Sequence, residues 1–282
     1  MEQYFYSICG LPIRVDSDIA IEEDPFRKRF AVPPCAPKLT LHITRTDGFQ
    51  HDGALISETD TDLIFEKAAE ILYCQRVSPK AAPYSVTVYR REAPAAAMTQ
   101  ITSEACAFAT DERYFWRTLA LPQLLPHFGA ILMHASMIAC GDSAILFSAP
   151  SGTGKSTQAA LWEQHCGAEI VNGDKAGIAL SANGFLACGV PFAGSSNICK
   201  KRDLPLKALV FLAQAAENSV TRLQGRAALQ AVMENMYYVR SSAAETHMLL
   251  DLLIQLTTQI PVFYLQCTPD LRAVSALQAA LK

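Results

Sequence analysis

The segment Ala149–Ser156, which reads APSGTGKS, constrains this 282-residue chain more than any other feature. It keeps the spacing of the phosphate-binding P-loop, G-x-x-x-x-G-K-[ST], with Ala149 in place of the first glycine. An apolar run over 143–147 precedes it, and the stretch that follows has helical character up to His165 and ends at Gly167. We therefore expect a strand, a loop and a helix in that order, which is the local fold that a phosphate-binding loop requires.

The residues of this loop have distinct expected tasks. Gly152 and Gly154 allow successive backbone N–H groups to turn toward one anion at the positive end of the helix. Lys155 would reach the β- and γ-phosphates of a nucleotide, and the Ser156 hydroxyl would ligate Mg²⁺. The expected nucleotide-binding residues are Pro150, Ser151, Gly152, Thr153, Gly154, Lys155, Ser156 and Thr157. The alternative is a Gly/Ser-rich turn with a chance lysine, and alanine at position 149 is tolerable unless that position needs a positive φ.

The composition is typical of a globular protein. Hydrophobic residues make up 50% of the chain and charged residues 18%, which excludes disorder, and the length allows one large domain or a core domain with a smaller appendage. The net charge of −3 and the lack of a long basic block argue against nucleic acid or an anionic membrane as the main partner. The nine cysteines form no C-x-x-C pair and the N-terminus has no basic leader, so we expect reduced, buried thiols in a cytoplasmic protein.

The patterning divides the chain into two parts. Alternating apolar and polar residues over 38–44 and 84–89 predict half-buried antiparallel strands in a small β-rich N-terminal subdomain, residues 1–108. The polar segment 47–61 between them is expected to be a loop. Residues 109–282 are expected to form an α/β domain with a mixed sheet, which contains the P-loop.

Further elements are expected inside this second part. An approximate helical face runs over 111–125, and the charge-free stretch that follows Arg117 reads as a helix end and a buried strand, because prolines interrupt it. Buried strands are also expected over the apolar segments 130–133, 168–171, 206–212 and 261–265.

A carboxylate and a basic run follow the P-loop helix. Asp174 comes directly after the strand expected over 168–171, where a carboxylate can hold Mg²⁺ or take a proton from an acceptor hydroxyl. The alternative is an Asn-Gly-Asp turn that bonds only to local backbone. Lys200, Lys201 and Arg202 could contact the transferred phosphoryl group or an acidic acceptor, or else form a solvated loop.

These motifs resemble the bacterial HPr serine kinases, whose core is related to ATP-dependent phosphoenolpyruvate carboxykinase. The resemblance covers roughly residues 110 to 270 and rests on the segments His134–Ser136, Ala149–Thr157, 170–177 (IVNGDKAG), 189–194 (GVPFAG), 205–212 and 218–223. The chain is also similar to the shorter HPr-kinase-like proteins that are encoded beside modified-peptide pathways. The resemblance implies a P-loop core of the HPr kinase type with a mixed sheet, over residues 109–282, beside the β-rich N-terminal subdomain.

In that family a histidine before the loop lies near the transferred phosphate, and two aspartates after the next strand serve as base and metal contact. The resemblance therefore implies catalytic roles for His134, Lys155 and Asp174, with Mg²⁺ on Ser156 and Asp174. The first aspartate is replaced by Gly173 in this chain. The one remaining carboxylate would then serve both tasks, leave one of them to another group, or make the protein a weak catalyst. The missing aspartate also argues against the carboxykinase reaction. The alternative for His134 is a core histidine bonded to backbone.

The implied activity is ATP-dependent transfer of the γ-phosphate to a hydroxyl, on Ser or Thr of a small protein or of a ribosomally made peptide. A kinase of the same fold that acts on a small metabolite is one alternative, and a nucleotide-binding sensor or scaffold with weak turnover is another. The expected cofactors are ATP and Mg²⁺, and the expected partner is a peptide, small-protein or small-molecule acceptor, with neither nucleic acid nor membrane. HPr kinases assemble as hexamers, so a homo-oligomer is an option, although the N-terminal part of this chain differs.

Overall fold

The computed structural model describes residues 1–22, 24–49 and 52–282, apart from the side chain of Ser195. The chain forms two compact units, which we call the N-terminal unit, Met1–Phe128 with Tyr238–Leu249, and the P-loop unit, Gly129–Tyr237 with Leu250–Lys282. Helices and mixed sheets occur in both units, so the expected α/β class is confirmed. The chain passes between the units three times, after residues 128, 237 and 249, whereas a single boundary was expected at residue 108.

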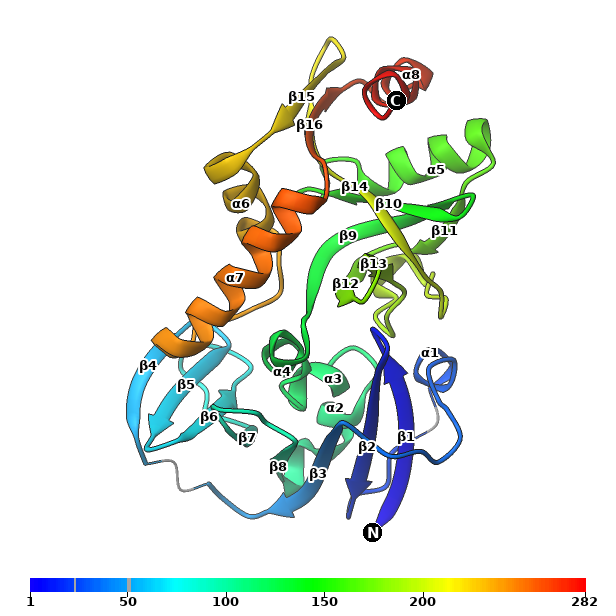
Figure 1. Cartoon of the computed structure of the whole chain (residues 1–282). Coiled ribbons are helices and arrows are strands. Elements are labelled where there is room, and N and C mark those ends of the chain that lie inside the picture. The colour runs from blue at the N-terminus through cyan, green and yellow to red at the C-terminus, as the bar shows by residue number, and fades with distance from the viewer. Residues whose placement is uncertain (23, 50–51) are drawn as a thin grey trace. The chain divides into compact units, whose positions relative to one another are not determined.

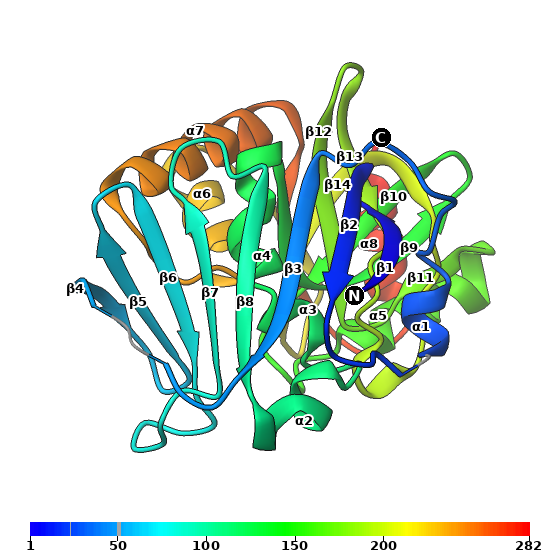
Figure 2. The same cartoon turned by 90° about the horizontal axis from the view of Figure 1, so that it is seen from below.

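The N-terminal unit contains a sheet of eight strands in the order β1-β2-β3-β8-β7-β6-β5-β4 (Figure 2). Its strands are β1 (Glu2–Ile8), β2 (Leu11–Ser17), β3 (Leu39–Thr46), β4 (Ala54–Glu58), β5 (Asp62–Lys67), β6 (Glu70–Gln75), β7 (Ser85–Arg90) and β8 (Ala96–Thr102). The neighbours of β3 on both sides are parallel to it, and the other pairs are antiparallel. The strands predicted over 38–44 and 84–89 are therefore confirmed as β3 and β7, but the antiparallel pairing predicted for both is wrong for β3, which is parallel to β2 and to β8. The loop predicted over 47–61 is wrong in part, because β4 occupies its second half and is held by pairing with β5.

Short helices pack on this sheet and explain why the unit continues past residue 108. They are α1 (Pro25–Lys28), α2 (Cys106–Thr110), α3 (Phe115–Thr118) and α4 (Leu121–Leu124). The single helix predicted over 111–125 is wrong, since Ala120 takes φ of 53° between α3 and α4. Trp116 meets Tyr6 edge to face at 5.1 Å, and Thr87 Oγ1 donates to Thr118 O at 2.9 Å. These contacts bind α3 to the N-terminal sheet.

The P-loop unit contains a second mixed sheet, in the order β10-β9-β12-β13-β14-β16-β15, with β11 also on β9 (Figure 1). Its strands are β9 (Ala130–Cys140), β10 (Ser143–Ser148), β11 (Glu169–Asn172), β12 (Lys175–Ser181), β13 (Gly184–Cys188), β14 (Asp203–Gln214), β15 (Ser219–Leu223) and β16 (Val262–Cys267). Because β14 pairs with both β13 and β10, the pairings from β9 through β12, β13, β14 and β10 return to β9. The strands predicted around residues 130, 144, 168, 206 and 262 are confirmed.

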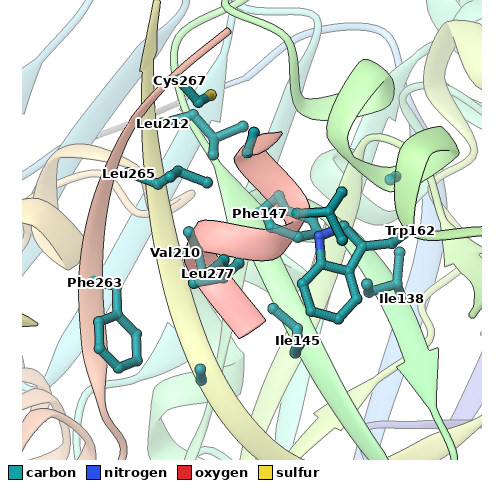
Figure 3. Close-up of a cluster of buried hydrophobic side chains, with 14 of the residues drawn as sticks. Ile138, Ile145, Phe147, Trp162, Val210, Leu212, Phe263, Leu265, Cys267 and Leu277 are labelled. Carbon is teal, nitrogen blue, oxygen red and sulfur yellow. The ribbon is translucent and has the colours of Figure 1, made fainter. Parts of the chain in front are cut away.

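Three parallel strands, β10, β14 and β16, form the part of this sheet that carries the P-loop. The helices of the unit are α5 (Lys155–Cys166), α6 (Gly225–Glu234), α8 (Leu271–Ala280) and the second half of α7 (Ala243–Gln259). Apolar side chains of α5 and α8 pack on the sheet, with Trp162 of α5 beside Phe147 of β10 and Leu277 of α8 in one buried cluster (Figure 3). This core fixes the helix that follows the loop against the strand that precedes it.

No helix within the described residues is long and apolar enough to cross a membrane. None of the nine cysteines forms a disulfide bond. The expectation that they are buried holds only in part, because Cys35 and Cys166 are exposed.

Candidate functional site

The loop between β10 and α5 has the backbone of an anion-binding turn. Gly152 and Gly154 have φ of 79° and 119°, which a side chain would make strained, and an added Cβ at either would meet nothing within 4 Å. Gly154 caps α5 without any side-chain hydrogen bond to the first turn, so the N–H groups there have no side-chain acceptor. Ala149 is buried and is not among the residues with positive φ, so alanine fits the place of the first glycine.

Lys155 lies under this loop and is bound to its carbonyl groups. Its Nζ donates to Ala149 O at 2.8 Å and to Pro150 O at 3.3 Å. The residue is only 8% exposed, and this burial lowers the pKa of its ammonium group, while the charge of Asp174 acts in the opposite direction. A buried ammonium with two carbonyl partners retains a strong attraction for an anion.

The other predicted loop residues lie around the same turn. Ser151 is exposed, Thr153 is half-buried, and Ser156 and Thr157 are exposed in the first turn of α5. Gln214, which sequence reasoning missed, closes the loop from the end of β14, because its Nε2 donates to Gly152 O at 3.3 Å and to Thr153 O at 3.4 Å. Its place at the carboxyl end of a parallel strand next to β10 is the signal that could have identified it.

Asp174 and His134 meet beside the start of the loop. Ser148, the last residue of β10, donates its hydroxyl to His134 O at 2.8 Å. The His134 Nε2 atom lies 3.6 Å from Asp174 Oδ1. Burial lowers the pKa of His134, and the charges of Lys155 and Lys175 lower it further, against the opposing effect of Asp174. The structure therefore brings the three predicted catalytic residues, His134, Lys155 and Asp174, into one electrostatically connected cluster.

Sequence reasoning missed two further members of this cluster, Lys175 and Tyr237. Lys175 is directly opposite His134 in the β12–β9 pairing, and its Nζ lies 2.8 Å from Asp174 Oδ2. Tyr237 stacks on the His134 ring, with centroids 6.0 Å apart and an interplanar angle of 27°. The adjacency of Lys175 to Asp174 was visible in the sequence, whereas Tyr237 reaches the site only because its N–H binds Leu132 O.

At Gly173, the position that the sequence resemblance assigns to a missing aspartate, the space for a side chain is filled. An added Cβ would lie 2.1 Å from Ser196 Oγ and 2.4 Å from Ser196 Cβ. Gly194, with φ of 55°, is equally close to Asp174. A Cβ added at Gly194 would lie 2.5 Å from the Asp174 Cβ, so the lack of a side chain at Gly194 leaves room for that of Asp174. The segment around Gly194 and Ser196 therefore encloses Gly173 and Asp174 closely.

The predicted basic run lies at the other end of β11. Lys200 Nζ is 2.9 Å from Glu169 Oε1, and Arg202 also forms an ion pair with Glu169, while Lys201 is exposed. Glu169 is the first residue of β11, and Asp174 follows its last residue. In this structure Lys200 and Arg202 thus neutralise a carboxylate of their own unit.

Two hollows border the P-loop. One, of about 530 Å³, is lined by Gly152, Thr153, Gly154, Thr157, Gln158, Gln214, Ala215, Cys267, Thr268 and Pro269. The other, of about 640 Å³, is lined by Ser148, Ala149, Pro150, Ser151, Gly152, Thr153, Phe211, Leu212, Ala213, Gln214, Ala231, Glu234, Asn235 and Tyr264. Gln158 is 2% exposed, and its Oε1 atom is buried without a hydrogen-bond partner. The side chain of Gln158 therefore borders the first hollow, while its Oε1 atom is buried behind the surface.

The described residues contain no group of three or more His, Cys, Asp or Glu side chains that could hold a metal ion by themselves. Mg²⁺ commonly binds through one or two protein oxygens together with phosphates and water. The hydroxyl of Ser156 and the carboxylate of Asp174, which is 26% exposed, fit that requirement.

The chain matches no protein-family model, and no curated protein matches it.

Proposed function

We propose that this protein is an ATP-dependent phosphotransferase that acts on a hydroxyl group. The observation that carries the proposal is the juxtaposition of the P-loop Lys155 with His134 on β9 and with the carboxylate of Asp174, between β11 and β12. Lys155 and Asp174 each act electrostatically on His134, and Asp174 lies 3.6 Å from it. Phosphoryl transfer requires mainly positioning and cations around the phosphate oxygens, together with a group that receives the hydroxyl proton. Lys155 and Asp174 have the chemistry for these two tasks.

In the proposed reaction, the acceptor oxygen forms a bond to the γ-phosphorus, and the bond from the γ-phosphorus to the bridging oxygen breaks. The electron pair of that bond stays on the β-phosphate of ADP, and the proton of the acceptor hydroxyl passes to the Asp174 carboxylate. Lys155 leaves the carbonyl groups of Ala149 and Pro150 to bind phosphate oxygens. Ser156 and Asp174 are the residues that would hold Mg²⁺, which supplies further positive charge to the phosphates when bound.

The nucleoside end of ATP is assigned to the hollow beside Thr157. The phosphates would lie over Gly152–Ser156, and Thr157 is the next residue of the first turn and lines that hollow. Gln158 also lines this hollow, and its Oε1 atom is buried without a partner, so it would accept from an N–H group of the base only after the side chain turns toward the hollow.

The resemblance to the HPr kinases supports Ser or Thr of a small protein or ribosomally made peptide as the acceptor, with a free metabolite as the alternative. The test is transfer of ³²P from γ-labelled ATP to the peptides and proteins encoded next to this chain. We expect Asp174→Asn to retain nucleotide binding through the P-loop and to lose at least about 100-fold in transfer rate. Undiminished transfer by Asp174→Asn would move the catalytic role to another residue.

The arrangement at Gly173 favours one competing function, a nucleotide-binding sensor. A second carboxylate has no room beside Ser196, so the paired aspartates of the HPr kinases have no equivalent here. Tight Mg·ATP binding without transfer to any neighbouring gene product, and without ATP hydrolysis, would establish the sensor in place of the kinase.

A further inference from the structure

Lys175 is a cation held in a fixed place next to the proposed reaction centre. Its Nζ lies 2.8 Å from Asp174 Oδ2, 4.8 Å from the centre of the Tyr237 ring and 5.4 Å from the centre of the Phe192 ring. The face of an aromatic ring attracts an ammonium group at these distances. The position of the Lys175 ammonium therefore does not depend on Asp174 alone.

Both rings are themselves anchored. The backbone of Phe192 is held by Asn172, whose Nδ2 donates to Phe192 O at 3.3 Å, and the Phe192 side chain is buried. Tyr237 binds Leu132 O through its N–H at 2.8 Å and stacks on His134. Lys175 thus lies between two rings that different parts of the P-loop unit position independently.

The ammonium of Lys175 faces the same centre as the P-loop lysine. Directly opposite residues of an antiparallel pair project from the same face of a sheet, and Lys175 is opposite His134. Lys155 comes to the same region from the P-loop helix, because its Nζ binds Ala149 O while the neighbouring Ser148 binds His134 O. Asp174 pairs with Lys175 at 2.8 Å, so the cluster has one carboxylate for two ammonium groups.

We propose that Lys175 binds the γ-phosphoryl group of the nucleotide together with Lys155. This inference rests on the proposed phosphotransfer function. When the carboxylate of Asp174 turns to the acceptor hydroxyl or to Mg²⁺, the Lys175 ammonium has donors available for γ-phosphate oxygens. Lys175 takes no part in the proton transfer, because the hydroxyl proton passes to Asp174, and its charge offsets the negative charge that the β-phosphate gains as the bond breaks. Lys175 would in this way supply part of the positive charge that a second metal ion supplies in kinases with two Mg²⁺ ions.

The test compares nucleotides with and without a γ-phosphate, so it needs no acceptor. Wild type, Lys175→Met and the control Lys200→Met are titrated with Mg·ADP and with the non-hydrolysable Mg·AMP-PNP. Methionine keeps an unbranched side chain between Phe192 and Tyr237, and Lys200 pairs with Glu169 at the far end of β11. We expect Lys175→Met to weaken Mg·AMP-PNP binding on the order of 10-fold or more and to leave Mg·ADP within about twofold, the size expected for one charge-assisted contact. Lys175→Arg, which keeps the charge, should retain most of the Mg·AMP-PNP affinity.

Several results would overturn the inference. An equal loss for both nucleotides in Lys175→Met, or no loss for either, would show that Lys175 only supports the structure. Lys175→Gln serves as the second neutral variant if Lys175→Met fails to fold, and the same comparison applies to it. A wild-type protein that binds neither nucleotide would refute the proposed function, and the role of Lys175 with it.

Discussion

Replacement of Gly173 by alanine tests the packing that sets the number of carboxylates at this site. Gly173 does not have a positive φ, so in open space the change to alanine should stabilise the protein by about 0.4–1 kcal/mol through the unfolded chain. The added Cβ instead meets Ser196 Oγ at 2.1 Å, and the serine must move. Ser196 would then lose its bonds to Ala193 O (2.7 Å) and Ile198 N (3.2 Å), each about 1 kcal/mol. With about 1–3 kcal/mol for overpacking, we expect a net destabilisation of about 2–4 kcal/mol.

The two tryptophans allow each unit to be followed separately. Trp116 lies in the N-terminal unit and Trp162 in the P-loop unit, so 5-fluorotryptophan labelling gives one ¹⁹F resonance for each during urea titration. The Trp162 transition of Gly173→Ala should shift down by about 1–2 M urea. The control Gly48→Ala, where an added Cβ meets nothing within 4 Å, should leave both transitions nearly unchanged.

A double variant then isolates the contact. In Gly173→Ala with Ser196→Gly the obstacle is gone, and the two changes should be coupled by at least about 1 kcal/mol. A Trp162 transition in Gly173→Ala at or above that of the wild type would refute the steric argument. Room for a second carboxylate would then exist, and Gly173→Asp would be the natural next variant.

Three other predictions concern the same unit. Burial holds the pKa of His134 in the folded protein below its ordinary value of 6.5, so the unfolded chain binds more protons between the folded and the unfolded pKa. The P-loop unit should therefore lose stability as the pH falls through that window. Urea titrations at pH 7.5 and 5.5 should show a smaller loss of stability in His134→Asn than in the wild type. Lys155→Ala should abolish the thermal stabilisation by Mg·ATP, about 2.7 kcal/mol for the wild type at a nucleotide concentration of 100 Kd, and an unchanged shift would refute the P-loop assignment. Glu169→Gln removes the ion pairs of Glu169 with Lys200 and Arg202, whose groups are exposed, so it should lower the free energy of unfolding by less than about 1 kcal/mol. It should change the affinity for Mg·AMP-PNP by no more than about twofold. A large gain in that affinity would show that Lys200 or Arg202 binds phosphate once it is released from Glu169.

Much of the P-loop unit could be predicted because its signals are local. The strand before the loop and the helix after it, to Cys166, follow from one motif and from a continuous apolar run. The hairpin of β12 and β13 was missed, although Asn183-Gly184 at its turn is a recognised hairpin signal. Tyr237 and Phe192 could not be predicted as site residues, because only the tertiary fold brings their rings to Lys175.

The helix predicted over 111–125 failed for a different reason. Its apolar spacing is real, but Pro122 and the left-handed Ala120 divide it into α3 and α4. Periodicity reports which residues are buried, and it does not report where the backbone turns between them.

The split of the N-terminal unit into two stretches of chain also bears on its biosynthesis. Its last segment, Tyr238–Leu249, leaves the ribosome only after most of the P-loop unit, and it carries Glu245, whose carboxylate lies 2.9 Å from the buried His127 Nε2. A nascent chain that ends before this segment would hold His127 without its partner. We therefore expect a fragment of residues 1–128 to be incompletely folded, and the N-terminal unit to finish folding late, after the phosphate-binding loop has already been made.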